Sequence, residues 1–256
     1  MISRDYVIKA FSKDDSMEAL KVYDKLRLAN ERDITVFTNS FLPPNIWSFF
    51  YENFNSSMFK VETNGFFEEC ERRVISFNNL YETEYPIVML VVESNSNFSE
   101  LTHRDYLGSI LSLGIEREKL GDIVIKGNKA YVPVMDDIWS YIYNNLTTIG
   151  RTPVKVSIIE NYDDVPRVQF QEDVIIVSSL RIDNFICKLA KVSRGKAIEL
   201  IDSGKVLVDY GKIKNKSQEI SKDTRITIRG TGKFIVGDII GETKSGKQRV
   251  IIKKYT

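Results

Sequence analysis

The stretch RIDNFICKLAKVSRGKAIELIDSGKVLVDYGK, residues 181–212, decides the fold of the C-terminal part of the chain. Over 181–191, apolar side chains recur at the i, i+3, i+4 and i+7 positions of one helical face, namely Ile182, Phe185, Ile186 and Leu189. Ser193 is a favourable N-cap for a second helix, and Gly204 is placed to end it. The pattern predicts two short helices that pack on a small sheet, with strands over 205–209, 224–229, 234–240 and 250–252.

The start of the second predicted helix carries two cations where acidic residues are usually favoured. Arg194 and Lys196 lie beside the positive end of the helix dipole. Free backbone N–H groups, the Ser193 hydroxyl and these two cations would together suit a phosphate. A solvated basic face without a ligand is the alternative, and the sequence leaves both interpretations open.

Charge is divided unevenly along the chain, although the formal net charge is only +1. Residues 181–256 hold 18 Lys and Arg against 8 Asp and Glu, a net charge of +10, and the preceding residues hold 18 against 27, a net charge of −9. The asymmetry indicates a nucleic-acid-binding end joined to an acidic body, unless two soluble domains differ in charge by accident. We expect RNA binding in which phosphate contacts dominate affinity. The candidate RNA-binding residues are Arg181, Lys188, Lys191, Ser193, Arg194, Lys196, Lys205, Lys212 and Lys233.

The bulk composition is that of a globular protein with ordinary cores. Its 256 residues, of which 43% are hydrophobic and 28% charged, fit two or three compact domains. The longest apolar run, residues 86–92, is far too short to span a bilayer, and residues 1–10 do not resemble a secretory signal. Two cysteines and a single histidine provide neither a disulfide framework nor a zinc site. We therefore expect a cytoplasmic protein without metal, cofactor or membrane partner.

Residues 1–78 are expected to form a mixed α/β domain. Its expected elements are a helix over 16–30 capped by Asp14 or Asp15, a strand over 34–37, a helix over 45–54 with prolines at its start, and a hairpin of strands 59–63 and 66–77 around Asn64-Gly65. Aromatic residues are frequent here. They could stack on bases, but such residues more often fill a core.

Residues 79–165 show a cleaner pattern. The expected elements are a strand over 87–93, a helix over 102–113, strands over 123–126 and 129–134 around Gly127-Asn128, a helix from Asp136 and Asp137 through Leu146, and a strand over 153–159. The order β-α-β-β-α-β is that of ferredoxin-like folds, which RNA-recognition motifs share. The aromatic signature of those motifs is absent, so base stacking on this sheet is not supported. Residues 163–178 indicate a linker that ends in a strand, and the chain as a whole indicates a multi-domain α+β protein.

The C-terminal part, residues 179–256, resembles the S4 RNA-binding domain. The core signature is carried by Arg181-Ile-Asp183, Phe185, Ser193-Arg194, Lys196-Ala197, Leu200-Ile201, Gly204 and Val206-x-Val208. Asp209 departs from the asparagine common after this strand, and Lys222-Asp223 departs from a Gly-Asp turn. The resemblance implies that the two helices and the following loop grip RNA by its shape and phosphates.

Two further segments resemble the central domain of the YlmH family, LTHRDYLG over 101–108 and LGIEREKLGDI over 113–123. The C-terminal position of the S4 domain and its GTGKF segment at 230–234 agree with that family. The resemblance implies a bacterial ribosome-associated protein with rRNA and tRNA as partners and no DNA. Family members are linked to the large subunit, to tRNA-bearing stalled complexes and to ribosome-associated quality control.

A second RNA contact is conceivable in the matching central segments, where His103, Arg104, Arg117 and Lys119 lie. The alternative is that Thr102 caps a helix whose first turn is exposed, and that Arg117 and Lys119 merely neighbour Glu116 and Glu118. The residues do not decide between the two.

Other functional classes are an RNA-modifying enzyme and a protein-interaction adaptor. Arg181-Ile-Asp183 superficially matches the context of a pseudouridine synthase aspartate, but it opens the S4 helix, where Asp183 is placed to cap or pair locally. Gly230-x-Gly232 precedes a strand rather than a helix, unlike a methyltransferase loop, and His103 has no evident catalytic partner. We therefore expect no catalytic residues. An adaptor role for the acidic N-terminal part is compatible with RNA binding.

Overall fold

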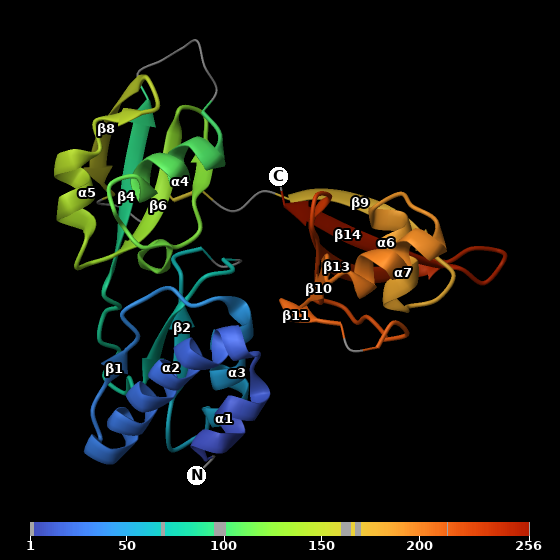
Figure 1. Ribbon diagram of the computed structural model, residues 1–256, viewed down its shortest axis with the longest axis horizontal. Coiled ribbons are helices and arrows are strands. Elements are labelled where there is room, and N and C mark those ends of the chain that lie inside the picture. The colour runs from blue at the N-terminus through green and yellow to red at the C-terminus, as the bar shows by residue number, and fades with distance from the viewer. Residues whose placement is uncertain are drawn as a thin grey trace. The chain divides into compact units, whose positions relative to one another are not determined.

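The computed structural model describes residues 3–67, 70–94, 101–159, 165–166, 170–213 and 215–255. The chain separates into two compact units, Met1–Val168 and Gln169–Thr256, and combines helices with three antiparallel sheets (Figure 1). Within the described ranges, no helix is both long and apolar enough to cross a membrane. The mixed α+β class is confirmed, whereas a division of the first unit near residue 78 stays a prediction.

The N-terminal segment of the first unit packs three helices on a small sheet. The helices are α1 (Arg4–Ala10), α2 (Lys13–Arg32) and α3 (Pro44–Phe54), and the strand order is β1 (Val36–Phe37), β3 (Val74–Phe77) and β2 (Val61–Asn64). Proline at the first position of α3 agrees with prediction. The aromatics expected to stack bases or fill a core include Phe50, which is fully buried, and Phe49, which packs against the same core.

Helix α2 begins earlier than its apolar stripe indicates. Its N-cap is Ser12, whose hydroxyl accepts a hydrogen bond from the Asp15 N–H at 3.4 Å. The expectation that Asp14 or Asp15 caps this helix was therefore wrong, because both lie inside it; the side chain of Asp14 is outside the described part of the structure. Ser12 lies about two turns before Leu20, where the apolar stripe begins, so hydrophobic periodicity does not reveal this cap.

The predicted hairpin forms, but its connection is not a two-residue turn at Asn64-Gly65. Strands β2 and β3 are antiparallel, and Asn64 pairs with Val74, so the connection between the two strands is longer than two residues. Gly65 is needed for close packing, because a Cβ atom there would lie 2.3 Å from the Cys70 Sγ atom and 2.4 Å from the Arg72 carbonyl oxygen.

The central segment contains a five-stranded sheet in the order β5-β6-β4-β8-β7, with every neighbouring pair antiparallel. Its elements are β4 (Ile87–Ser94), α4 (His103–Leu111), the 3-10 helix η1 (Arg117–Lys119), β5 (Val124–Lys126), β6 (Lys129–Met135), α5 (Trp139–Asn145), β7 (Thr148–Ile149) and β8 (Thr152–Ile158). The buried residues Tyr106 and Ile110 of α4 and Ile142 of α5 pack in one cluster with strand residues. Helix α5 starts later than expected, since its N-cap is Ile138, without a side-chain cap, and Asp137 instead pairs with Lys119.

Hydrogen bonds and a shared core join these two segments within the first unit. The Asp122 carboxylate accepts hydrogen bonds from the Glu71 and Arg72 N–H groups, and the Phe41 N–H donates to the Glu118 carbonyl at 2.7 Å. One buried cluster contains Phe41, Val74, Ile87 and Met135, which come from both segments.

The second unit is a six-stranded antiparallel sheet with two helices on one face (Figure 1). Its elements are β9 (Phe170–Val177), α6 (Ile182–Leu189), α7 (Arg194–Asp202), β10 (Val206–Val208), β11 (Gly211–Lys212), β12 (Arg225–Ile228), β13 (Gly232–Glu242) and β14 (Gln248–Tyr255), in the sheet order β11-β10-β12-β13-β14-β9. The predicted apolar faces of both helices are buried against alternate residues of the strands. The expected linker ends in β9, while Asp163 and Asp164 within it lie outside the described residues.

Candidate nucleic-acid interface

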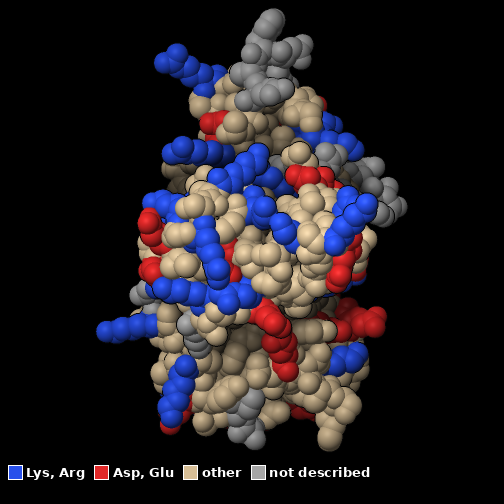
Figure 2. All heavy atoms as spheres, turned by 90° about the vertical axis from the view of Figure 1, so that its right-hand side faces the viewer, with Lys and Arg blue, Asp and Glu red and all other residues tan. Residues whose placement is uncertain are grey.

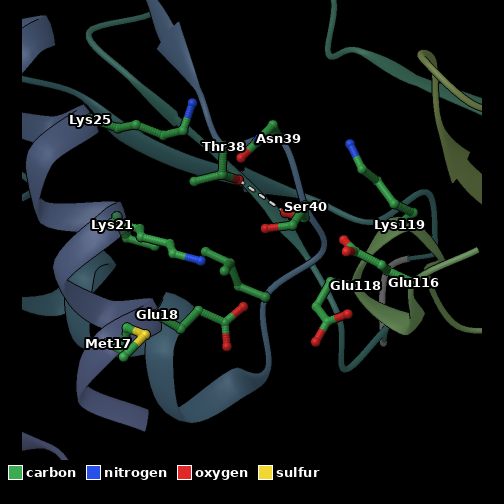
Figure 3. A pocket seen from close by; sticks show the side chains of 12 residues that line it. Met17, Glu18, Lys21, Lys25, Thr38, Asn39, Ser40, Glu116, Glu118 and Lys119 are labelled. Atoms are coloured by element: carbon green, nitrogen blue, oxygen red, sulfur yellow. Dashed lines mark hydrogen bonds between the residues drawn. The ribbon is translucent and has the colours of Figure 1, made fainter.

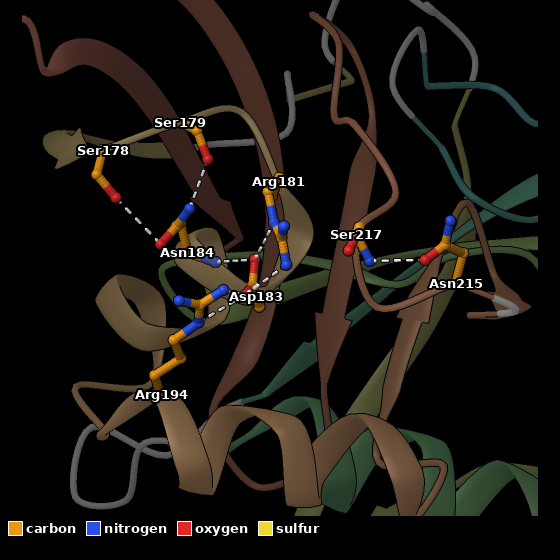
Figure 4. A network of polar contacts seen from close by, with 8 residues as sticks. All are labelled: Ser178, Ser179, Arg181, Asp183, Asn184, Arg194, Asn215 and Ser217. Atoms are coloured by element: carbon orange, nitrogen blue, oxygen red, sulfur yellow. Dashed lines mark hydrogen bonds and ion pairs between the residues drawn. The ribbon is translucent and has the colours of Figure 1, made fainter.

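A buried carboxylate holds two arginines at the start of the helix pair. Asp183, in the first turn of α6, is only 1% exposed. It accepts hydrogen bonds from Arg181 Nε and Nη2 at 3.1 Å each, and from Arg194 Nε at 3.0 Å, with Arg194 Nη2 2.9 Å away (Figure 4). Both guanidinium groups are thereby fixed by one acidic side chain. We call Arg181, Asp183 and Arg194 the arginine clamp.

The electrostatics of the arginine clamp favour an ionised carboxylate. Burial of Asp183 acts to raise its pKa, but the hydrogen bonds and charges of Arg181 and Arg194 outweigh burial and hold the pKa below its usual value. The side chains of Arg181 and Arg194 remain 37% and 63% exposed. A guanidinium has five N–H donors, so each arginine keeps donors for a phosphate while it is bound to Asp183.

Polar contacts next to the clamp fix the backbone that enters α6. Asn184 Nδ2 donates to the Ser179 hydroxyl at 2.7 Å, and the Ser178 hydroxyl donates to Asn184 Oδ1 at 3.2 Å (Figure 4). The Ile182 N–H donates to the Gln218 carbonyl at 2.9 Å, so the segment before β12 lies beside the start of this helix. Within that segment the Ser217 N–H donates to Asn215 Oδ1 at 2.9 Å.

The start of α7 is electrostatically more balanced than its sequence indicates. Ser193 is the N-cap, as predicted, and its hydroxyl accepts from the Lys196 N–H at 3.3 Å. Arg194 is bound to Asp183, and Lys196 Nζ pairs with Glu199 at 2.6 Å. Both cations therefore have acidic partners, one on the neighbouring helix and one in the next turn of α7, and phosphate binding at this helix start stays a prediction.

The candidate residues of the second unit divide between two faces. Lys188 in the last turn of α6, Lys191 in the connection, and the first turn of α7 are exposed around the helix pair, and Lys205 is exposed just after α7. Lys212 and Lys233 instead lie on the sheet face opposite the helices. Across the strands, Lys212 pairs with Leu207, Leu207 with Thr227, and Thr227 with Lys233. The core residues of β10, β12 and β13 alternate with these residues along each strand, so they point to the opposite face.

The candidate residues of the first unit differ in whether their side chains are held within the unit or are exposed. Arg117 Nη1 donates to the Leu120 and Gly121 carbonyls at 2.6 and 3.3 Å, and burial lowers the pKa of Arg117 to about 10. Lys119 is paired with Asp137. By contrast, His103 and Arg104 are exposed in the first turn of α4, behind a capping box formed by Thr102 and Asp105.

A polar pocket of about 530 Å³ also lies in the first unit (Figure 3). Figure 3 shows Glu18, Lys21 and Lys25 of α2 on one side and Glu118 and Lys119 on the other. Burial, followed by the charge of Glu118, raises the pKa of Glu18, and burial, followed by Lys119, lowers the pKa of Lys25. Mixed charges of this kind give no clear preference for an anion or a cation.

Exposed Lys and Arg side chains are numerous on the face shown in Figure 2. In the second unit they come from helices, connections and strands alike. Among the described residues, no group of three or more His, Cys, Asp and Glu side chains is placed to hold a metal ion.

Two stretches of the chain match domains of known proteins. Residues 81–163 match the model of the RNA-binding domain in YlmH, and residues 180–226 match the S4 domain. The chain is 28% identical over 196 residues to "Ribosome-associated protein quality control protein P2" of Bacillus subtilis (strain 168), covering 75% of this chain and 76% of that protein.

A solved structure shares the fold. The "Cell division protein ylmH from Streptococcus pneumoniae" superimposes with a TM-score of 0.50 at 20% sequence identity, covering 61% of this chain and 97% of the other. The matched domains occur in the order that the sequence signatures predict, with the YlmH RNA-binding domain before the S4 domain. The chain therefore carries a match to the YlmH RNA-binding domain followed by a match to the S4 domain, and it is similar to proteins of the YlmH family.

Proposed function

We propose that this protein grips structured RNA, rRNA or tRNA, through its S4 domain without catalysing a reaction, and that it works at the large ribosomal subunit in ribosome-associated quality control. The observation that carries the proposal is the arginine clamp, which presents two ordered guanidinium groups at the edge of the helix pair. The name of the Bacillus subtilis relative supports the ribosomal setting. Such a setting is cytoplasmic.

The physical basis of binding is electrostatic positioning. An arginine that is already held in place loses less side-chain entropy when it binds a phosphate, and its planar fork suits two phosphate oxygens. Lys188, Lys191 and Lys196 add exposed charge around the same helix pair. If about five phosphates are neutralised, the logarithm of affinity should fall with the logarithm of salt concentration with a slope of about −3.5 to −4.5.

The buried position of Asp183 argues against a pseudouridine synthase. A catalytic aspartate must reach the reacting base, whereas Asp183 is 1% exposed and its oxygens are bound by two arginines. Its geometry suits a positioning residue. An adaptor role for the acidic first unit remains compatible with RNA binding by the second.

In the central segment we infer a ferredoxin-like arrangement. The observed strand order β8-β4-β6-β5, with α4 between β4 and β5 and α5 between β6 and β8, supports this topology. A second RNA contact there would use His103 and Arg104, which are exposed. Arg117 and Lys119 are left out of it, because their charged groups are engaged within the unit.

Co-sedimentation with separated ribosomal subunits tests the proposal. The Arg194→Glu, Lys196→Glu variant should lose binding to the large subunit, and so should Lys188→Glu, Lys191→Glu, which leaves the arginine clamp intact. Lys244→Glu, Lys247→Glu is the matched control, because it makes the same change in charge at the exposed β13–β14 turn. An equal loss of large-subunit binding in the control would mean that the effect comes from the change in net charge alone. Absence of wild-type sedimentation would overturn the ribosomal assignment.

A further inference from the structure

We infer that the open face of the six-stranded sheet in the second unit is a second RNA-binding surface, which contacts the phosphate backbone of an RNA segment on the side opposite α6 and α7. The inference rests on the proposed function and deepens it, because it makes this unit a two-sided RNA binder. Alternate strand residues face the helices and form the core, so the residues between them face away from it.

Two cross-strand rows bring cations together on this open face. The first row runs from Lys212 through Leu207 and Thr227 to Lys233. The second row runs from Arg225 through Ile235 and Lys253 to Glu172. Residues directly opposite on antiparallel strands point to the same face, so the register alone places these side chains together.

A third cationic position lies further along β14. Arg249 is four residues before Lys253 and therefore on the same face, where it pairs with Ile176 of β9. Lys212, Lys233 and Arg249 are exposed, and Arg225 and Lys253 are half-buried. Lys253 also lies 5.9 Å above the Phe170 ring. Of the charged side chains in these described rows, Glu172 alone is acidic, and it is on the edge strand.

The spacing of these cations suits a nucleic-acid backbone. Neighbouring strands are about 4.8 Å apart and alternate residues of a strand about 7 Å apart, so the cations form a grid with steps of roughly 7 to 14 Å. Phosphates repeat along both strands of a duplex, so such a grid can meet several at once. These strands also extend the matched S4 domain, since β13 and β14 lie beyond residue 226.

An acidic polypeptide is the competing occupant. It would use the aliphatic strip beside the cations, where Val174 and Ile176 are 43% and 40% exposed and Val174 pairs with Ile251. The observations favour RNA, because the cations come from four different strands, and Lys212, Arg225 and Lys233 lie on strands away from this strip. A polypeptide added to edge strand β9 would instead lie beside Glu172 and Asp173, which repel acidic groups.

Fluorescence anisotropy with the full chain tests the inference, using a labelled 20-base-pair RNA hairpin and, in parallel, labelled poly-glutamate. The variant is Lys212→Gln, Lys233→Gln, Lys253→Gln. We expect its RNA affinity to fall about tenfold or more, and the salt slope to become shallower by about 2 to 3. Lys222→Gln, Lys244→Gln, Lys247→Gln has the same change in charge outside the rows and should stay within about threefold of wild type.

Combination with the helix-face variant separates the two surfaces. We call Lys188→Gln, Lys191→Gln the helix-face variant and Lys212→Gln, Lys233→Gln, Lys253→Gln the sheet-face variant. In the combined variant the fold-losses of RNA affinity should multiply, because distant sites without shared partners act independently.

If the sheet-face variant binds RNA like wild type while the helix-face variant is impaired, the inference fails and the proposed function stands. A selective loss of poly-glutamate binding would assign the face to an acidic protein and overturn the inference. If wild type binds no RNA, both fail. Unchanged circular dichroism and melting temperature establish that the variants are folded.

Discussion

The guanidinium of Arg194, at the start of α7, is bound to the buried carboxylate of Asp183, in the first turn of α6, with Nη2 and Oδ2 2.9 Å apart. The two residues are eleven positions apart in sequence and lie on different helices. The pair therefore fixes one helix start against the other. Because Arg181 binds the same carboxylate, the loss of Asp183 should disturb both guanidinium groups.

Replacement of Asp183 by Asn should weaken RNA binding even though it raises the net charge by one. Asparagine offers one neutral acceptor oxygen in place of two charged ones, and its NH2 group cannot accept a hydrogen bond, so it cannot hold both guanidinium groups as the carboxylate does. We expect about threefold to tenfold weaker binding of the labelled hairpin. Because both arginines stay partly exposed, the loss in unfolding free energy should be only about 1–2 kcal/mol.

Asp202→Asn is the matched control, since it removes an exposed carboxylate that pairs with Lys216 at 2.7 Å. It makes the same change in charge, so long-range attraction alone predicts tighter RNA binding in both variants. Tighter binding by Asp183→Asn would show that the carboxylate merely neutralises the arginines and does not position them.

The pH dependence of stability should report on the same carboxylate. The pKa of Asp183 is lowered in the folded state, so its contribution is complete above the unfolded value, about 4, and is lost as the pH falls through the folded pKa. The difference in urea midpoint between wild type and Asp183→Asn should be constant above about pH 5 and shrink below about pH 4. A difference that stays constant to pH 3 would contradict the ionised clamp.

The helices of the second unit could be predicted from sequence because their signals are local. Apolar residues at helical spacing and the Ser193 cap lie within a few residues of one another. The arginine clamp could not be predicted as a whole, since it depends on how two helices pack. Asp183 was expected to cap or pair locally, and Arg181 does pair with it, but the bond from Arg194 carries no sequence signal.

Strand register limited the prediction of the site more than secondary structure did. Lys212 and Lys233 were grouped with the helix cations because all are basic residues of one domain. Their face depends on which residue of β10 and β12 stands opposite each, and a shift by one residue would reverse it. Long-range pairing of this kind is not encoded in periodicity.

Arg117 is expected to be a structural residue and not an RNA contact. Its guanidinium closes the turn after η1 by donating to two carbonyls, so Arg117→Ala leaves both without that donor. We predict a loss of about 1–3 kcal/mol in the stability of the first unit, with RNA affinity within twofold of wild type. Tryptophan fluorescence reports this unit, because Trp47 and Trp139 both lie in it.

Arg104→Ala provides the contrast, because that side chain is exposed in the first turn of α4. It should leave stability within about 0.5 kcal/mol of wild type. If Arg117→Ala reduced RNA affinity without loss of stability, the structural role of Arg117 would be refuted.

Gly65 should be among the least replaceable glycines of the first unit. A Cβ atom there would lie 2.3 Å from the Cys70 Sγ atom and 2.4 Å from the backbone oxygen of Arg72, and backbone cannot move aside as a flexible side chain can. Gly65→Ala is expected to cost about 1–3 kcal/mol or more of unfolding free energy. Gly108→Ala is the matched control, because a Cβ there meets nothing within 4 Å and alanine favours the helix by up to about 1 kcal/mol. Urea unfolding followed by tryptophan fluorescence should therefore shift in opposite directions for the two variants, whereas a stable Gly65→Ala protein would mean that the 65–73 connection repacks freely.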